Sequence, residues 1–179
     1  MTTLHIDSSI NGDNSASRAI SRSIVDQLAT DRLVYRDLVA DPLPHLTFDA
    51  FADSSVLDEF LAADTLVIGA PMYNFTLPSQ LKAWLDRILV AGKTFRYTES
   101  GPEGLAGGKR VIVALARGGM YDVGSPAAAL EHLESYLRGI FNFIGIEPEF
   151  VAADGLNFGP EQRETSLNAA LGETLRLAA

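Results

Sequence analysis

The chain has 179 residues, of which 47% are hydrophobic, 14 are Lys or Arg and 23 are Asp or Glu, for a net charge of −9. This length fits one domain spanning residues 1–179, and the acidic balance argues against a nucleic-acid partner, because binding a phosphate backbone needs clustered basic residues. The lack of cysteine excludes disulfides, catalytic thiolates and cysteine metal ligands, and no hydrophobic run reaches the ~18 residues of a membrane span.

The first segment, Met1 to Asp7, has neither the basic stretch nor the cleavage-site pattern of a secretion signal. We therefore expect a cytoplasmic protein without a membrane partner. From here to the end of the chain, short hydrophobic stretches alternate with helical periodicity. The predicted strands are Thr2–Asp7, Leu33–Asp37, Thr65–Ala70, Arg110–Ala116 and Glu149–Ala153. Several are continuous hydrophobic runs, which is typical of strands covered on both faces of a parallel sheet.

The segments between the strands predict helices. Hydrophobic residues three and four positions apart form stripes after the first strand, after Pro78 and from Leu130 to Ile144. A short helix is expected from Ser54 or Ser55 to Ala62, and a last helix begins at Pro160, a residue suited to a first helical turn. Strands that alternate with helices in this way predict a doubly wound α/β sandwich.

One insertion, from Gly92 to Gly108, interrupts this alternation. It contains the sequence Thr-Phe-Arg-Tyr-Thr-Glu-Ser-Gly-Pro from Thr94 to Pro102. The Gly-Pro turn after three bulky residues predicts a hairpin or an ordered loop. Ordered loops beside strand ends often carry function.

In open α/β sheets, ligands bind beyond the carboxyl ends of the strands. The first strand-to-helix loop, Ser8 to Ser17, leads directly into a helix. A helix N-terminus offers free N–H groups and the positive end of the helix dipole, which suit a phosphate. The hydroxyls of Ser9, Ser15 and Ser17 add hydrogen-bonding groups, and Arg18 adds charge. The alternative is a simple turn in which Asn14 or Ser15 caps the helix.

The second loop, Ala70 to Phe75, follows a buried strand and has the sequence Ala-Pro-Met-Tyr-Asn-Phe. Its hydrophobic and aromatic side chains suit a flat ligand ring, although aromatic residues in this position also commonly pack in a core. The third loop, Ala116 to Tyr121, places Gly118 and Gly119 after another buried strand, so its backbone can approach a ligand closely or form a tight turn. Together the three loops indicate a site for flavin mononucleotide (FMN).

Other nucleotide motifs are absent. No G-x-G-x-x-G follows the first strand, and no G-x-x-x-x-G-K-[ST] occurs in the chain, which disfavours a dinucleotide-binding Rossmann domain and a P-loop enzyme.

Several segments resemble the FMN-dependent NADH-azoreductases, which are also described as FMN-dependent NADH:quinone oxidoreductases. The matching segments are Ser8–Ile10 with Ser15–Ser17, Ala70–Phe75, Gly92–Leu105 and Ala116–Gly119. Met-Tyr-Asn-Phe and Thr-Phe-Arg-Tyr-Thr-Glu are the specific motifs, and their order and spacing fit nearly the whole chain.

The resemblance implies a flavodoxin-like fold with a five-stranded parallel sheet in the order 2-1-3-4-5, and a homodimer with active sites at the subunit interface. It implies bound FMN, with NADH as the electron donor. The FMN-binding residues expected are Ser9, Ser15, Ala16, Ser17, Pro71, Met72, Tyr73, Asn74, Phe75, Ala116, Arg117, Gly118 and Gly119. No metal is expected.

The implied activity is a ping-pong transfer of hydride from NADH through FMN to quinones, with reductive cleavage of aromatic azo compounds. Tyr121 or Tyr97 is the candidate proton donor to the acceptor. NADH is favoured over NADPH because only Arg96, Arg117 and Lys93 are obvious partners for a 2′-phosphate. The alternatives are a one-electron carrier like flavodoxin and a reductase that uses FMN as a substrate.

The chain departs from the family pattern at a few places. Ala16 replaces a polar residue, Ala116 replaces a frequent serine, and Tyr121 stands where some relatives carry histidine. The region from Asp49 to Ser55 is shorter than usual, which is expected to reshape the pocket.

Overall fold

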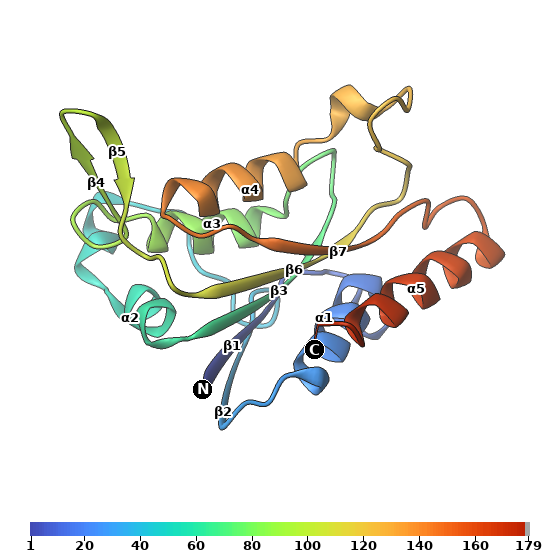
Figure 1. The fold of residues 1–179 in the computed structure, drawn as a ribbon, viewed down its shortest axis with the longest axis horizontal. Helices are drawn as coiled ribbons and strands as arrows, with labels where there is room; N and C mark the ends of the chain where they lie inside the picture. The colour runs from blue at the N-terminus through green and yellow to red at the C-terminus, as the bar shows by residue number, and fades with distance from the viewer. Residues whose placement is uncertain (178–179) are drawn as a thin grey trace.

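A parallel sheet of five strands forms the centre of the computed structural model, which describes residues 1–177 (Figure 1). In chain order its strands are β1 (Thr2–Asp7), β2 (Arg32–Asp37), β3 (Thr65–Pro71), β6 (Arg110–Ala116) and β7 (Glu149–Ala153). They lie side by side in the order β2-β1-β3-β6-β7. The expected order, written 2-1-3-4-5, is corrected to this one because β4 and β5 belong to a separate hairpin.

That hairpin is formed by β4 (Phe95–Thr98) and β5 (Gly101–Gly104), which pair antiparallel. It projects from one end of the molecule, beside the end of α4 (Figure 1). The close approach of Gly104 to Gly145 anchors it, because a Cβ atom at Gly104 would lie only 2.1 Å from the backbone nitrogen of Gly145. Of the two possibilities for the insertion, a hairpin or an ordered loop, the structure has the hairpin.

Helices cover both faces of the sheet (Figure 1). On one face lie α1 (Ala16–Gln27) and α5 (Pro160–Thr174), and on the other lie α2 (Ser55–Ala62), α3 (Ser79–Ile88) and α4 (Glu134–Phe143). Short 3-10 turns occupy Gly12–Asn14, Phe48–Ala52 and Ala128–Leu130. None of the helices within residues 1–177 is long and hydrophobic enough to cross a membrane.

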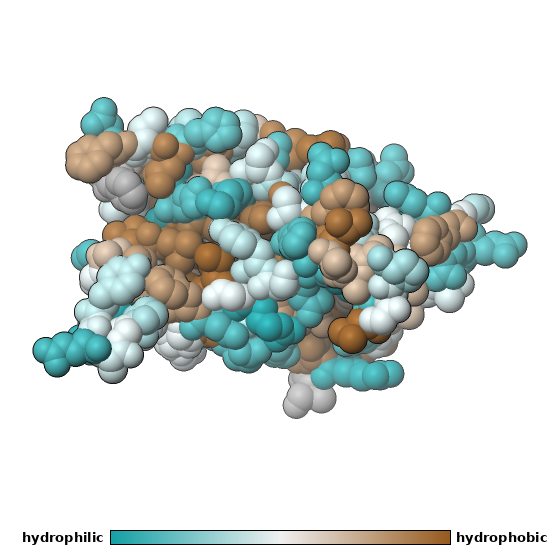
Figure 2. Space-filling view, turned by 90° about the horizontal axis from the view of Figure 1, so that it is seen from above, coloured by the Kyte–Doolittle hydropathy of each residue, from teal (hydrophilic) through white to brown (hydrophobic). Residues whose placement is uncertain are grey.

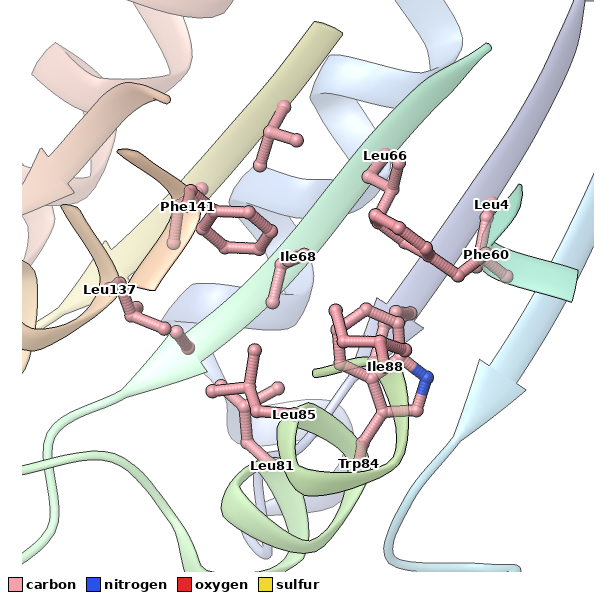
Figure 3. Close-up of a cluster of buried hydrophobic side chains, with 14 of the residues drawn as sticks. Leu4, Phe60, Leu66, Ile68, Leu81, Trp84, Leu85, Ile88, Leu137 and Phe141 are labelled. Carbon is pink, nitrogen blue, oxygen red and sulfur yellow. The ribbon is translucent and has the colours of Figure 1, made fainter. Parts of the chain in front are cut away.

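The central strand β3 is buried along its whole length because alternate side chains enter two cores. On β3, Leu66 and Ile68 face the helices α2, α3 and α4, whereas Val67 faces α1 and α5. Figure 3 shows the larger core, in which Phe60 and Trp84 pack edge to face with ring centroids 6.2 Å apart.

The helix predicted from Leu130 is shorter in the structure. Residues 128–130 form a separate 3-10 turn, and α4 begins at Glu134. The carboxylate of Glu131 accepts hydrogen bonds from the backbone N–H groups of Leu133, Glu134 and Ser135, and so satisfies the free donors at the start of the helix. The hydrophobic periodicity continues upstream to Leu130, so it does not mark the helix start. The Glu131 cap marks it instead.

Candidate functional site

The first loop joins β1 to α1 at the carboxyl edge of the sheet. Ser15 caps the helix, since its hydroxyl oxygen accepts the N–H of Arg18 at 3.2 Å. This cap leaves the N–H groups of Ala16 and Ser17 without a hydrogen-bond acceptor within residues 1–177. Capping and phosphate binding are therefore compatible, and two N–H groups at the positive end of the helix dipole remain available for an anion.

Arg18 does not point its charge into this site. Its guanidinium forms two hydrogen bonds with the carboxylate of Asp37, at 2.7 and 2.9 Å, and donates to the carbonyl oxygen of Ser9 at 2.9 and 3.2 Å. The hydrogen bond from Arg18 holds the pKa of Asp37 below its ordinary value. The expectation that Arg18 adds charge at the phosphate is corrected, because this residue instead holds the first loop against β2.

The second loop makes a strained turn directly after β3. Asn74 and Phe75 have φ angles of 48° and 73°, a left-handed conformation that is unusual for residues other than glycine. Reciprocal backbone hydrogen bonds between Tyr73 and Thr76, at 2.9 and 3.2 Å, close the turn. The N–H of His132 also donates to the carbonyl of Phe75 at 3.0 Å. Strain maintained by such contacts is typical of functional sites. The Phe75 side chain is exposed to solvent.

Tyr73 joins the second loop to the first. Its hydroxyl oxygen accepts the N–H of Ile10 at 3.0 Å and lies 3.3 Å from the Ser9 hydroxyl. The second loop is also tied to the third, because the N–H of Met72 donates to the carbonyl of Ala116 at 2.9 Å. These bonds fix the relative positions of the three loops.

The third loop pairs with a fourth segment that follows β7. Hydrogen bonds run from Leu156 N–H to Arg117 O at 3.1 Å, and from Asn157 N–H to Gly118 O at 3.0 Å. A side chain at Gly118 would displace Asn157, since a Cβ atom would lie 2.4 Å from the Asn157 amide nitrogen. The N–H groups of Gly118 and Gly119 have no acceptor in the part of the chain that the structure describes, so both can meet a ligand.

Arg117 anchors this loop from behind. Its guanidinium is buried and forms two hydrogen bonds with Asp154, at 2.5 and 2.9 Å. Carboxylate oxygens of Glu134 and Glu131 lie 3.3 and 3.7 Å from the same guanidinium. Burial would lower the pKa of Arg117, but the hydrogen bond to Asp154 and the nearby carboxylates outweigh it and raise that pKa above its ordinary value. Its side chain is committed to these carboxylates, so its contribution to a ligand is limited to the backbone.

The loops enclose a pocket at the carboxyl edge of the sheet. Of the predicted site residues, those that line it are Ser9, Ser15, Ala16, Pro71, Met72, Tyr73, Ala116 and Gly118. The structure does not place Ser17, Asn74, Phe75, Arg117 or Gly119 in its lining. Residues that the sequence analysis missed also line it, namely Asn11, Leu156, Asn157 and Arg163.

The missed residues near β7 had a signal in the sequence. Leu156 and Asn157 follow the last predicted strand, and parallel strands bring all their carboxyl ends to one edge. The loop after β7 therefore belonged with the other three. Arg163 lies in the first turn of α5, which makes it part of the same edge.

The two candidate proton donors lie apart. Tyr121 is half-buried beside the third loop, where a Cβ atom at Gly119 would lie 3.2 Å from its ring. Tyr97 lies on the projecting hairpin, far from the loop that leads into α4 (Figure 1), and its side chain is 75% exposed. Of these two tyrosines, Tyr121 is the one that lies beside the Gly-Gly pair within the same chain, although it does not line the pocket.

Comparisons with known proteins agree with this architecture. A family model described as "Flavodoxin-like fold" matches residues 1–177. An FMN-dependent NADH:quinone oxidoreductase from Bradyrhizobium diazoefficiens is 56% identical, and the alignment covers all of both chains. This chain belongs to the FMN-dependent NADH:quinone oxidoreductase family. The resemblance seen in the sequence motifs is thereby confirmed.

Solved structures lead to the same family. The azoreductase AzrA superposes with a TM-score of 0.91 at 29% identity and 99% coverage of both chains. An FMN-dependent NADH-azoreductase from Bacillus anthracis, solved in complex with FMN, superposes with a TM-score of 0.86 at 26% identity, covering 99% of this chain and 98% of that one. The alignment with the Bradyrhizobium relative runs over 201 positions, so that relative carries residues that this chain of 179 lacks.

Proposed function

We propose that this protein is a cytoplasmic, homodimeric FMN-dependent NADH:quinone oxidoreductase that also cleaves aromatic azo compounds reductively. The observation that carries the proposal is the convergence of three loops on one pocket: a capped helix N-terminus, an aromatic turn and a Gly-Gly backbone. Each supplies a type of contact that a different part of FMN needs.

The chemistry of the pocket fits FMN. The free N–H groups of Ala16 and Ser17, with the Ser9 hydroxyl, suit the phosphate. Met72 offers a hydrophobic surface for the ring system. The absence of a Cβ atom at Gly118 lets the Asn157 amide lie against the third loop, and both residues line the pocket, where they suit a polar ring edge.

Bound FMN supplies the two-electron chemistry, by which hydride from NADH reaches a quinone. The chain orients the reactants and stabilises charge. The N–H groups of Gly118 and Gly119, which are held in place by Arg117 and by the segment after β7, would donate hydrogen bonds to the polar edge of the flavin ring. The hydroxyl of Tyr121 donates a proton to the acceptor oxygen.

A homodimer would complete the site. Hydrophobic residues gather on the face formed by α3, α4 and the hairpin (Figure 2). They include Val90, Phe95, Ile140 and Phe143, which pack on the core but remain partly exposed. A second copy seated on this face would cover them, and would bring the hairpin with Tyr97 toward the partner's pocket.

NADH suits this chain better than NADPH. Of the three cations considered for a 2′-phosphate, Arg96 pairs with Glu103 at 2.7 Å and Arg117 is buried among carboxylates. Lys93 lines a separate groove with Asp53 and Arg87. Within the part of the chain that the structure describes, none of the three offers a free charge at the pocket, which supports NADH as the donor.

The test is direct. The purified protein should be yellow, carry about one FMN per chain, and oxidise NADH quickly only when a quinone such as menadione is present. Size-exclusion chromatography should give the mass of a dimer. A protein that binds no FMN at micromolar concentration contradicts the proposal, and one that binds FMN without oxidising NADH favours the electron carrier. A Tyr121→Phe variant with unchanged turnover on every quinone removes the proton-donor role from Tyr121.

A further inference from the structure

Arg163 is the one charged residue among those described that line the pocket. It lies in the first turn of α5, which begins at Pro160, and its side chain crosses to the first loop. There one guanidinium nitrogen donates to the carbonyl oxygen of Asn14 at 2.7 Å. This contact places the cation beside the N-terminus of α1, the part of the pocket that suits a phosphate.

The remaining hydrogen-bond donors of Arg163 are available. A guanidinium group carries five N–H donors, and Asn14 accepts from a single nitrogen. Within residues 1–177, no carboxylate forms an ion pair with Arg163. Its charge is therefore not neutralised by the described part of the protein.

The other basic residues nearby do not serve the pocket. Arg18 is paired with Asp37, and Arg22 is exposed on α1 and lines a neighbouring groove instead. The whole chain carries a net charge of −9. A phosphate group adds about −1.5 to −2 more, so local positive charge is needed to offset repulsion by the rest of the molecule.

We propose that Arg163 neutralises the phosphate of the bound flavin mononucleotide and makes the protein select it over riboflavin, which lacks the phosphate. This inference rests on the proposed function. Charge-assisted contacts between arginine and phosphate oxygens are among the stronger hydrogen bonds in proteins. Arg163 is a binding residue here, and the chemistry of hydride transfer does not involve it.

The experiment compares the affinities of the full chain, freed of flavin, for FMN and for riboflavin, followed by quenching of flavin fluorescence. The variants are Arg163→Gln, Arg163→Lys and the control Arg22→Gln, which removes the same charge from an exposed position outside the pocket. Arg163→Gln should weaken FMN binding about tenfold, which corresponds to about 1.4 kcal/mol, and leave riboflavin binding unchanged. Arg163→Lys should retain most of the FMN affinity, and Arg22→Gln all of it.

Salt gives a second measurement. Raising the ionic strength from 0.02 to 0.5 M should weaken FMN binding by the wild type more than by Arg163→Gln, because salt screens the charge contact. Equal FMN affinity of wild type and Arg163→Gln overturns the inference while leaving the proposed function intact. Equal losses for FMN and riboflavin also overturn it, since they would show that Arg163 only shapes the loop. A wild-type protein that binds neither flavin overturns the proposed function and this inference together.

Discussion

Replacing Arg117 by methionine tests whether a buried ion cluster holds the third loop in place. The Arg117 side chain is only 6% exposed, and the residue directly precedes Gly118 in the third loop. Its two hydrogen bonds to Asp154 connect the third loop with the segment after β7. Methionine keeps much of the side-chain volume but leaves the surrounding carboxylates without their shared cation.

The burial and the remaining partners of the three carboxylates set the expected loss of stability. Removing one partner of a buried ion pair costs about 3–5 kcal/mol, because the other charge stays buried. Glu134 keeps its hydrogen bond from Arg138, and Glu131 keeps three from backbone N–H groups. Asp154 therefore loses most, and we expect a decrease of about 3 kcal/mol in the free energy of unfolding. Since domains are typically stable by about 5–15 kcal/mol, the variant should still fold.

Urea unfolding at pH 7, followed by circular dichroism, measures this decrease. The control is Arg138→Met, which removes a cation from the same Glu134 at a side chain that is 43% exposed, and should cost about 1 kcal/mol or less. FMN affinity should fall in Arg117→Met and stay unchanged in Arg138→Met. The reasoning is refuted if Arg117→Met loses no more stability than Arg138→Met.

Three further changes test other parts of the site. Gly118→Ala should weaken FMN binding and lower the free energy of unfolding by about 1 kcal/mol, because the new Cβ atom would displace the Asn157 amide that lies 2.4 Å away. The control Gly139→Ala has open space at the Cβ position and should leave FMN binding unchanged. Equal FMN binding by both variants would contradict this reasoning. Tyr73→Phe should cost about 1 kcal/mol in a urea titration, because the Ile10 N–H loses its acceptor; a stability equal to the wild type would argue against a role in joining the loops. Since the hydrogen bond from Arg18 holds the pKa of Asp37 below its ordinary value of 3.8, that ion pair stabilises the fold fully above this pH and is lost as the pH falls through the lower folded-state pKa. Asp37→Asn should therefore be about 2 kcal/mol less stable at pH 7, with a smaller difference at pH 3, and a difference that does not change with pH would count against the ion pair.

Local patterns were enough to predict the elements that surround the site. The strands Thr2–Asp7, Arg110–Ala116 and Glu149–Ala153 lie where hydrophobic runs predicted them, and α5 begins at the predicted Pro160. Such runs identify strands because both faces of a parallel sheet are covered, which favours hydrophobic side chains at most positions. The predicted helix start at Leu130 was wrong, because the Glu131 carboxylate caps a helix that begins at Glu134, although the hydrophobic periodicity extends further upstream.

The sequence by itself identified three of the loops that line the pocket and the cofactor that suits them, because strand ends, glycines and specific motifs are local features; the segment after β7 was missed. Only the tertiary structure decided how the side chains divide their roles. Arg18 and Arg117 turn away from the pocket toward carboxylates on other elements, whereas Arg163, about 150 residues from the first loop, reaches its Asn14 carbonyl. A charged side chain takes whichever partner the packing of distant segments brings near, and no local pattern records that choice.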